Sequence, residues 1–199
     1  MLKRAFDIIF SVCALLVLAP LLLVVALWVK ADSAGPVFFR QRRVGLSGRE
    51  FLIFKFRTMR TDAEARGPQV TVGADTRITR SGVFLRKYKI DEFPQFLNVL
   101  FGDMSVVGPR PEVPRYVALY PDGLRDLVLS VRPGITDLAS IEYRDENDLL
   151  GCSADPENTY ITEVMPAKLA FCERYVRERS FAGDLGIIRR SFAASFVRH

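Results

Sequence analysis

The chain contains 199 residues with a formal net charge of +5, and 49% of them are hydrophobic. This length predicts one globular domain with a buried core, and the positive charge favours polyanionic partners: nucleic acid, anionic lipid or phosphorylated substrates. The single histidine is the last residue, His199, which excludes Ser-His-Asp, Cys-His and histidine-metal chemistry. Three cysteines without metal-ligand spacing (Cys13, Cys152 and Cys172) fit a reduced environment and packing roles.

The first predicted element is an apolar run, Ile8 to Val29, roughly the 20 residues that a bilayer core requires. A secretory signal is disfavoured because the run is long and lacks a small-residue cleavage site. Pro20 would kink the helix, and basic residues at both ends favour a cytoplasmic position for both flanks. We therefore expect residues 1–30 to form a Pro-broken, re-entrant membrane helix and residues 31–199 a cytoplasmic domain. A helix that spans the bilayer stays an open alternative.

A β-hairpin is predicted next, with strands over residues 37–44 and 51–59 joined by a turn-rich segment. Lys55 and Arg57 would lie on one face of the second strand. A solvated edge is the usual reason for such charges. The alternatives are a phosphate site or a membrane-surface patch, because the surrounding segment is rich in basic residues. Residues 60–81 lack periodicity and predict a mobile surface loop.

Two adjacent carboxylates, Asp91 and Glu92, precede Pro94. Because proline is tolerated in the first turn of a helix and not in its interior, a helix is predicted to start at about Asp91. The positive end of its dipole would favour anions there. The purely structural alternative makes Asp91 an N-cap and Glu92 a first-turn acid. Three cations just upstream favour a functional site instead: Arg86, Lys87 and Lys89.

Two loops each present an arginine beside proline. Arg110 stands between Pro109 and Pro111, and Arg132 precedes Pro133. Proline restricts the backbone on either side of it, and arginine can bind phosphate oxygens through two parallel hydrogen bonds. Together with the basic hairpin and the acidic pair, these loops indicate a phosphate-binding site.

The C-terminal part is predicted to be helical. One helix covers about residues 157–178 and is interrupted by Pro166. Residues 184–197 form an amphipathic helix with basic flanks, which either packs on the core or lies in the bilayer interface. Residues 143–150 are polar and then apolar, which fits a pocket edge, a helix start or a solvated face.

These motifs resemble the catalytic unit of the bacterial sugar transferases of the monotopic phosphoglycosyl transferase family. The resemblance covers roughly residues 3–136 and rests on KRAFD with the Pro-broken apolar run, GPVFFRQRRVG, FKFRTM, FLRKYKIDEFPQFLNVLFGDMSVVGPRP and RPGIT. The chain departs from the family pattern at two positions. Asp137 stands where glycine is commoner, within the motif for the nucleotide-sugar pocket. Ala19 stands where some members have serine, before the proline of the helix break.

The resemblance implies a helix-rich α+β fold with a re-entrant membrane helix, a small globular domain with a β-hairpin, and amphipathic interface helices. It implies transfer of a sugar 1-phosphate from a UDP-sugar to polyprenyl phosphate (undecaprenyl phosphate in most bacteria), with release of UMP. The enzyme would act in surface glycan or glycoconjugate assembly, at the cytoplasmic face of the bacterial inner membrane. We expect the catalytic unit only, without the additional N-terminal membrane region of larger relatives.

By motif position, the resemblance also implies roles for individual residues. Asp91 would be the nucleophile that forms a phosphosugar ester and a ligand of Mg²⁺, with Glu92 as its acidic partner. Lys55 and Arg86 match catalytic positions that hold phosphate or metal-site geometry. The residues expected to bind the nucleotide phosphates are Arg57, Arg110, Pro111 and Arg132.

A non-catalytic adaptor that binds anionic lipid at the membrane surface is the alternative function, and it predicts binding without metal dependence. A nucleic-acid-binding module is disfavoured by the apolar run; its signature would be a steep loss of binding with salt. The sequence leaves open which sugar is transferred, which glycan pathway is served, and whether the chain forms a homodimer.

Overall fold

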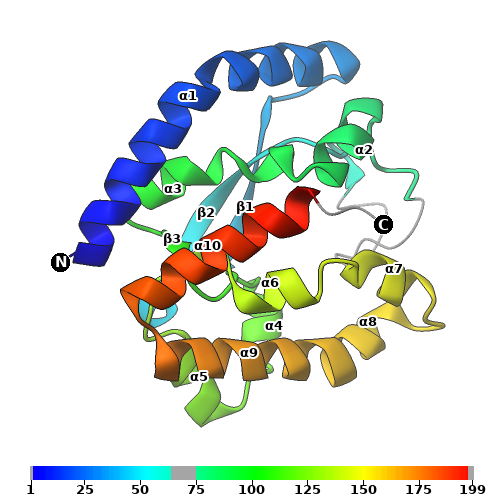
Figure 1. Cartoon of the computed structure of the whole chain (residues 1–199). Helices are drawn as coiled ribbons and strands as arrows, with labels where there is room; N and C mark the ends of the chain where they lie inside the picture. The colour runs from blue at the N-terminus through cyan, green and yellow to red at the C-terminus, as the bar shows by residue number, and fades with distance from the viewer. Residues whose placement is uncertain (1, 64–74, 197–199) are drawn as a thin grey trace.

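The computed structural model describes residues 2–63 and 75–196. It has a helix-rich α+β fold (Figure 1), which confirms the predicted class. In chain order its helices and strands are α1 (Leu2–Asp32), β1 (Phe38–Val44), η1 (Leu46–Gly48), β2 (Glu50–Phe56), α2 (Arg80–Lys87), η3 (Ile90–Glu92), α3 (Gln95–Phe101), β3 (Ser105–Val107), α4 (Pro114–Val117), α5 (Asp122–Val128), β4 (Gly134–Thr136), α6 (Leu138–Glu142), α7 (Glu146–Gly151), α8 (Pro156–Thr159), η4 (Tyr160–Val164), α9 (Met165–Glu178) and α10 (Phe181–Phe196).

Helix α1 lies along one side of the molecule, and its axis changes direction partway along (Figure 1). Within the described residues it is the one helix long and apolar enough to cross a membrane. Pro20 lies inside the helix, which is continuous through that residue. Large apolar side chains on α1 are exposed, Leu16 to 70% and Val17 to 78%. This helix therefore presents an apolar surface suited to lipid, while its re-entrant path stays a prediction.

Both ends of α1 are bonded to the rest of the fold. Near the start, Asp7 Oδ2 accepts a hydrogen bond from Ser105 Oγ (2.9 Å) and Asp7 Oδ1 accepts one from Val106 N (3.1 Å). At the end, Asp32 Oδ2 accepts hydrogen bonds from Ser81 N (2.9 Å) and Ser81 Oγ (2.8 Å). The backbone bond from Ser81 lowers the pKa of Asp32. Both ends of the apolar helix are thus fixed to the same folded domain.

The predicted hairpin is confirmed. Strands β1 and β2 pair antiparallel, with Phe38 opposite Phe56, so Arg57 lies just beyond the end of β2. Ile53 is buried in the core, and Lys55, on the same face of the strand, has a side chain only 18% exposed. The face of Lys55 points into the protein, so the solvated-edge interpretation is wrong.

The segment after the hairpin was predicted as a surface loop, and residues 64–74 of it lie outside the described residues. Of the remainder, Met59 forms a β-bridge with Ile78. Helix α2 then begins at Arg80, where the hydroxyl of Thr79 caps it by accepting a hydrogen bond from Gly82 N (3.0 Å). The end of the predicted loop is therefore helical.

The predicted helix start at Asp91 is wrong by one turn. Asp91 and Glu92 lie on the 3₁₀ turn η3, and α3 begins at Gln95 with Pro94 as its N-cap residue. Lys89 has a left-handed backbone (φ 56°) that turns the chain between α2 and η3. The acidic pair therefore precedes α3 instead of forming its first turn. Charged side chains, and not the dipole of α3, set the electrostatic environment of the pair.

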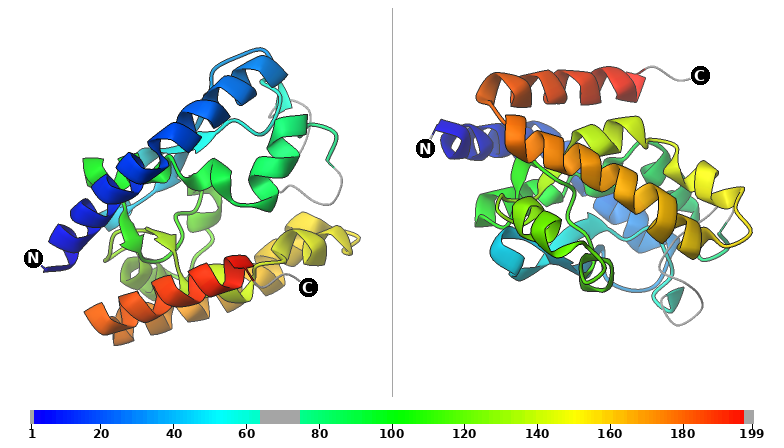
Figure 2. Two further views of the ribbon diagram at one scale, coloured as in Figure 1. Left: turned by 45° about the horizontal axis from the view of Figure 1, so that its top comes forward. Right: turned by 90° about the horizontal axis from the view of Figure 1, so that it is seen from below.

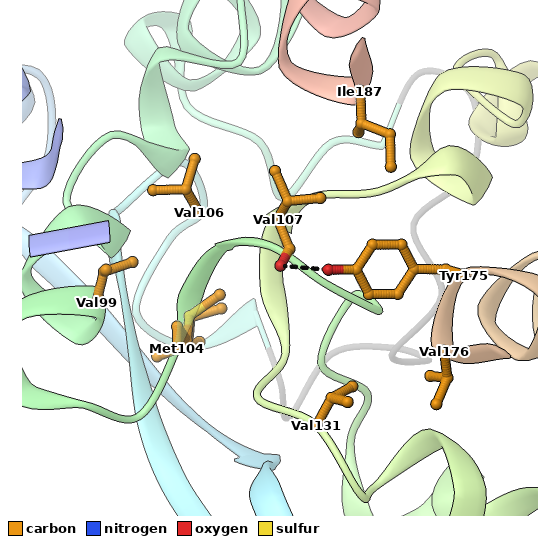
Figure 3. Close-up of a cluster of buried hydrophobic side chains, with 9 residues drawn as sticks. Val99, Met104, Val106, Val107, Val131, Tyr175, Val176 and Ile187 are labelled. Atoms are coloured by element: carbon orange, nitrogen blue, oxygen red, sulfur yellow. Dashed lines mark hydrogen bonds between the residues drawn. The ribbon is translucent and has the colours of Figure 1, made fainter. Parts of the chain in front are cut away.

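A second sheet was not predicted: β3 and β4 pair in parallel. Gly108 and Gly134 allow the two segments to approach, since a Cβ at Gly134 would lie 2.1 Å from Gly108 N. Tyr175 Oη donates a hydrogen bond to Val107 O (3.1 Å) and joins α9 to this sheet (Figure 3). The buried cluster around it includes Val99, Met104, Val106, Val131, Val176 and Ile187.

The helix predicted over residues 157–178 is divided into α8, η4 and α9. The backbone stays helical from α8 through the π-helix η4 into α9, and η4 ends just before Pro166, which has no N–H to donate. The predicted amphipathic helix is α10, which lies at the edge of the molecule (Figure 2). Its Ile187 is buried, whereas Leu185 is 44% and Phe192 57% exposed. It packs on the core and also presents apolar side chains outward.

The anchor at the start of α1 gives a stability prediction. Asp7→Ala leaves Ser105 Oγ and Val106 N without their acceptor, and an unsatisfied buried polar group costs about 1–3 kcal/mol. Each kcal/mol corresponds to about 2–4 °C in Tm for a chain of this size. We expect Tm in detergent to fall by several degrees. Asp126→Ala, at a side chain 81% exposed, is the control, and an equal fall in both variants would contradict the anchor.

Candidate active site

A cavity of about 490 Å³ contains the acidic pair. Its lining residues come from α1, β1, β2, α2, η3, α3, β3, α4, β4, α6, α7, η4, α9 and α10 and from the loops between them. One group of lining residues is charged: Lys55, Arg86, Lys89, Asp91, Glu92 and Arg110. A second group combines charged residues with tyrosines: Arg43, Glu112, Tyr116, Tyr143, Glu146, Tyr160 and Lys168. A third is apolar: Phe10, Phe93, Phe96, Ile135, Ile141, Ile188 and Phe192.

Glu92 is held by two cations. Lys55 Nζ donates to Glu92 Oε1 (2.8 Å), Arg110 Nη1 donates to Glu92 Oε2 (3.1 Å), and Arg110 Nη2 also bonds Glu92 Oε1. Burial acts to raise the pKa of Glu92, but the charges of Arg110 and Lys55 outweigh it and hold that pKa well below its ordinary value. Glu92 in turn raises the pKa of Arg110. This triad stays ionised and fixed in place.

Asp91 stands in contrast to its neighbour. It is 7% exposed and lines the cavity, and its Oδ1 has no hydrogen-bond partner among the residues that the structure describes. Burial raises the pKa of Asp91, the charge of Glu92 raises it further, and Lys55 and Arg86 act against both. Asp91 therefore has a carboxylate oxygen that is not engaged by the protein and lies close to cations.

Arg86 lines the cavity beside Asp91. Its Nε donates to Thr58 Oγ1 (3.1 Å). Burial lowers the pKa of Arg86, and the charge of Asp91 opposes that shift. Burial likewise lowers the pKa of Lys55, against the charge of Glu92. The sequence prediction that Lys55, Arg86, Asp91 and Glu92 meet at one place therefore agrees with the geometry.

Three residues expected to bind nucleotide phosphates do not line the cavity. Arg57 Nη2 donates to Ser33 O (2.6 Å) and Val29 O (3.3 Å), so it caps the end of α1. Arg132 is exposed, and its Nε donates to Gly102 O (2.8 Å). Pro111 contributes its carbonyl to Arg43 Nη1 (3.1 Å). Of the four predicted residues, only Arg110 reaches the cavity.

Sequence reasoning missed a second polar network in the cavity. Glu112 Oε1 accepts from Arg43 Nη1 (3.0 Å), and Glu112 Oε2 accepts from Tyr160 Oη (2.5 Å). Lys168 Nζ pairs with Glu146 Oε2 (2.8 Å). The position of Glu112 directly after the Pro-Arg-Pro loop was a usable signal. The residues of η4 and α9 gave none, since they meet Glu112 only through the tertiary fold.

The residues around Asp91 suit a divalent cation only in part. An unengaged, buried carboxylate oxygen fits Mg²⁺, which prefers oxygen ligands and retains several waters. Within the described ranges, no group of three or more His, Cys, Asp or Glu side chains could hold a metal ion. Further ligands would have to be water or substrate oxygens.

A long, largely exposed apolar helix suggests membrane association, and the cavity beside it holds an acidic pair whose Glu92 is bonded to two cations. The chain belongs to the bacterial sugar transferase family, whose model matches residues 1–198.

The similar curated proteins are named for sugar-phosphate transfer or exopolysaccharide production. The UDP-glucose:undecaprenyl-phosphate glucose-1-phosphate transferase of Escherichia coli K12 is 38% identical over 99% of this chain and 40% of its own length. The UDP-N-acetylgalactosamine-undecaprenyl-phosphate N-acetylgalactosaminephosphotransferase of Aeromonas hydrophila is 41% identical over 80% of this chain and 37% of its own length. The exopolysaccharide production protein PSS of Rhizobium leguminosarum is 49% identical over 70% of this chain and 73% of its own length. The chain therefore spans about two fifths of the first two relatives.

The pKa of Asp91 is raised and that of Glu92 is lowered, and this difference gives a second prediction. Because the pKa of Asp91 is raised, ionisation of this carboxyl costs more free energy in the folded protein than in the unfolded chain. Asp91→Asn should therefore raise Tm at pH 7. The gain should shrink as the pH falls through the raised pKa, and it should vanish below the ordinary value of 3.8, where the carboxyl is protonated in both states.

Glu92→Gln is the matched comparison. Its charge is paired, so its loss leaves Lys55 and Arg110 uncompensated and should lower Tm at pH 7. Thermal unfolding in detergent with EDTA measures both variants. If Tm changed in the same direction in both variants, the inferred difference between the two carboxylates would be contradicted.

Proposed function

We propose that this chain transfers a sugar 1-phosphate from a UDP-sugar to polyprenyl phosphate, with undecaprenyl phosphate as the expected acceptor, and releases UMP. The observation that carries the proposal is the unengaged carboxylate of Asp91 among cavity-lining cations. A carboxylate is ionised at neutral pH and attacks phosphorus without a general base. The names of the relatives, which specify UDP-sugar and undecaprenyl-phosphate chemistry, support the same reaction.

The proposed reaction has two displacements. The carboxylate of Asp91 attacks the β-phosphorus of the UDP-sugar, the bond from that phosphorus to the bridging oxygen breaks, and UMP leaves with the bridging oxygen. A phosphate oxygen of the lipid then attacks the aspartyl-phosphosugar. The bond to Asp91 breaks, which yields polyprenyl-diphosphate-sugar and restores the carboxylate.

Cations are needed because an anion attacks a pyrophosphate. Arg86 and Lys55 lie near Asp91 and would bind oxygens of the transferred phosphate. Glu92 keeps Lys55 and Arg110 in the cavity through its two oxygens. Mg²⁺, held by Asp91 and donor phosphate oxygens, would neutralise charge on the pyrophosphate when bound.

The apolar part of the cavity suits the lipid acceptor. Phe10 of α1 and Phe96 of α3 have ring centroids 6.0 Å apart, and Ile188 and Phe192 of α10 complete this wall. Since α1 also exposes apolar side chains, we place it in the bilayer, with residues 31–199 on the cytoplasmic face of the bacterial inner membrane. Because both ends of α1 are bonded to one domain, the re-entrant path is favoured over a span.

The direct test is nucleotide release by detergent-solubilised protein from a panel of UDP-sugars with polyprenyl phosphate. We expect UMP release from one donor with Mg²⁺ and none with EDTA. Asp91→Asn should reduce release to background while the protein stays folded. Asp122→Asn, at a side chain 92% exposed, should leave it unchanged.

Other outcomes would separate the alternatives. UDP release would indicate a glycosyl transferase and overturn the role of Asp91. Silence across the panel, with metal-independent binding to anionic vesicles, would support an adaptor instead.

The path of α1 can be tested separately. Ala5→Cys and Ala34→Cys, each with Cys13 replaced by serine, place thiols near the two ends of α1. Cys152 is exposed and reports the side of the catalytic domain. In sealed inverted membrane vesicles, a membrane-impermeant maleimide should label both new thiols and Cys152. Protection of the thiol at position 5, with labelling at position 34, would show that α1 spans the membrane.

A further inference from the structure

Asp137 uses its two carboxylate oxygens for two different parts of the chain. It is 2% exposed. Its Oδ1 accepts from Ser140 N (2.7 Å), which caps α6. Its Oδ2 accepts from Arg110 N (3.1 Å), in the loop after β3. A buried side chain therefore connects the start of α6 to the backbone of a cavity-lining arginine.

The loop after β3 is bonded to β4 through backbone groups as well. Gly108 N donates to Thr136 O (3.1 Å), and Gly134 N donates to Pro109 O (2.9 Å). Pro109 has no N–H, so the next donor along this loop is Arg110 N. By that point the partner segment has turned into α6, which begins at Leu138. The side chain of Asp137 supplies the acceptor for this N–H.

Arg110 connects this backbone bond to the acidic pair. Its guanidinium binds both oxygens of Glu92, and Glu92 precedes Pro94 and adjoins Asp91 on the turn η3. We propose that Asp137 is a positioning residue of the transfer reaction, which fixes the backbone of Arg110 so that its guanidinium holds Glu92 beside Asp91. This inference rests on the proposed function.

A helix cap alone does not account for Asp137. Capping needs one oxygen, and Asp155 shows this at α8: its Oδ1 accepts from Asn158 N (3.1 Å), and its side chain is exposed. Asp137 is buried and uses its second oxygen on Arg110. Asparagine caps helices about as well as aspartate, but it offers one acceptor oxygen and an NH₂ group. Asp137→Asn therefore keeps the cap and removes the acceptor for Arg110 N.

The experiment measures UMP release and hydrogen exchange for Asp137→Asn, with Asp155→Asn as the matched cap control. For Asp137→Asn we expect kcat to fall about tenfold, as for loss of one buried hydrogen bond. KM for the UDP-sugar should stay within about twofold, and Tm should fall by a few degrees at most. Amide exchange in residues 105–111 should become faster. Asp155→Asn should change none of these.

Arg110→Lys supplies the second readout. Lysine keeps the backbone N–H but cannot bind Glu92 through two parallel hydrogen bonds. If Asp137 acts through Arg110, adding Asp137→Asn to Arg110→Lys should lower kcat less than about twofold further, because coupled residues are not additive. A full tenfold fall in both backgrounds would overturn the inference, as would an unchanged kcat in the single variant. If the wild-type protein releases no UMP, the proposed function is overturned, and the exchange measurement still decides whether Asp137 holds Arg110.

Discussion

The ion cluster of Glu92, Lys55 and Arg110 is the interaction on which the rest of the active centre depends. Buried charges are tolerated only when they are paired, and here one carboxylate takes both cations. Its neighbour Asp91 is left without a hydrogen bond to its Oδ1 among the described residues. Two adjacent acids thereby acquire different properties from their surroundings: one is structural and always ionised, the other is available for chemistry.

That cluster is assembled from segments far apart in the sequence. Lys55 comes from the hairpin, Glu92 from a 3₁₀ turn and Arg110 from a loop. The loop is in turn fixed by β4 and by the carboxylate of Asp137 at the start of α6. The small parallel sheet contributes Val106 and Val107 to the buried core. Its importance is that it fixes the position of the loop that carries Arg110.

The sequence was informative wherever function depends on local pattern. The hairpin, the amphipathic α10 and the meeting of Asp91, Glu92, Lys55 and Arg86 follow from alternation, proline positions and motif. The β3–β4 pair could not be predicted, because two three-residue strands have no periodicity and pair only after the domain has folded. Arg57 was predicted to bind phosphate because the sequence shows its positive charge. Its actual partners, carbonyl groups at the end of α1, come from a distant segment that the sequence does not bring next to it.

The bonds at the start of α1 also bear on the order of synthesis. Lys3 Nζ lies 2.5 Å from Asp184 Oδ2, and the other oxygen of that carboxylate, Oδ1, accepts a hydrogen bond from Tyr175 Oη (3.0 Å). Val25 and Val29 of α1 share a buried cluster with Phe56 and Leu85. Helix α1 is thus held in part by α10, which is synthesised much later. Residues of α10 also line the cavity, so the cavity is complete only after α10 has been made, and α1 and α10 belong to one folding unit.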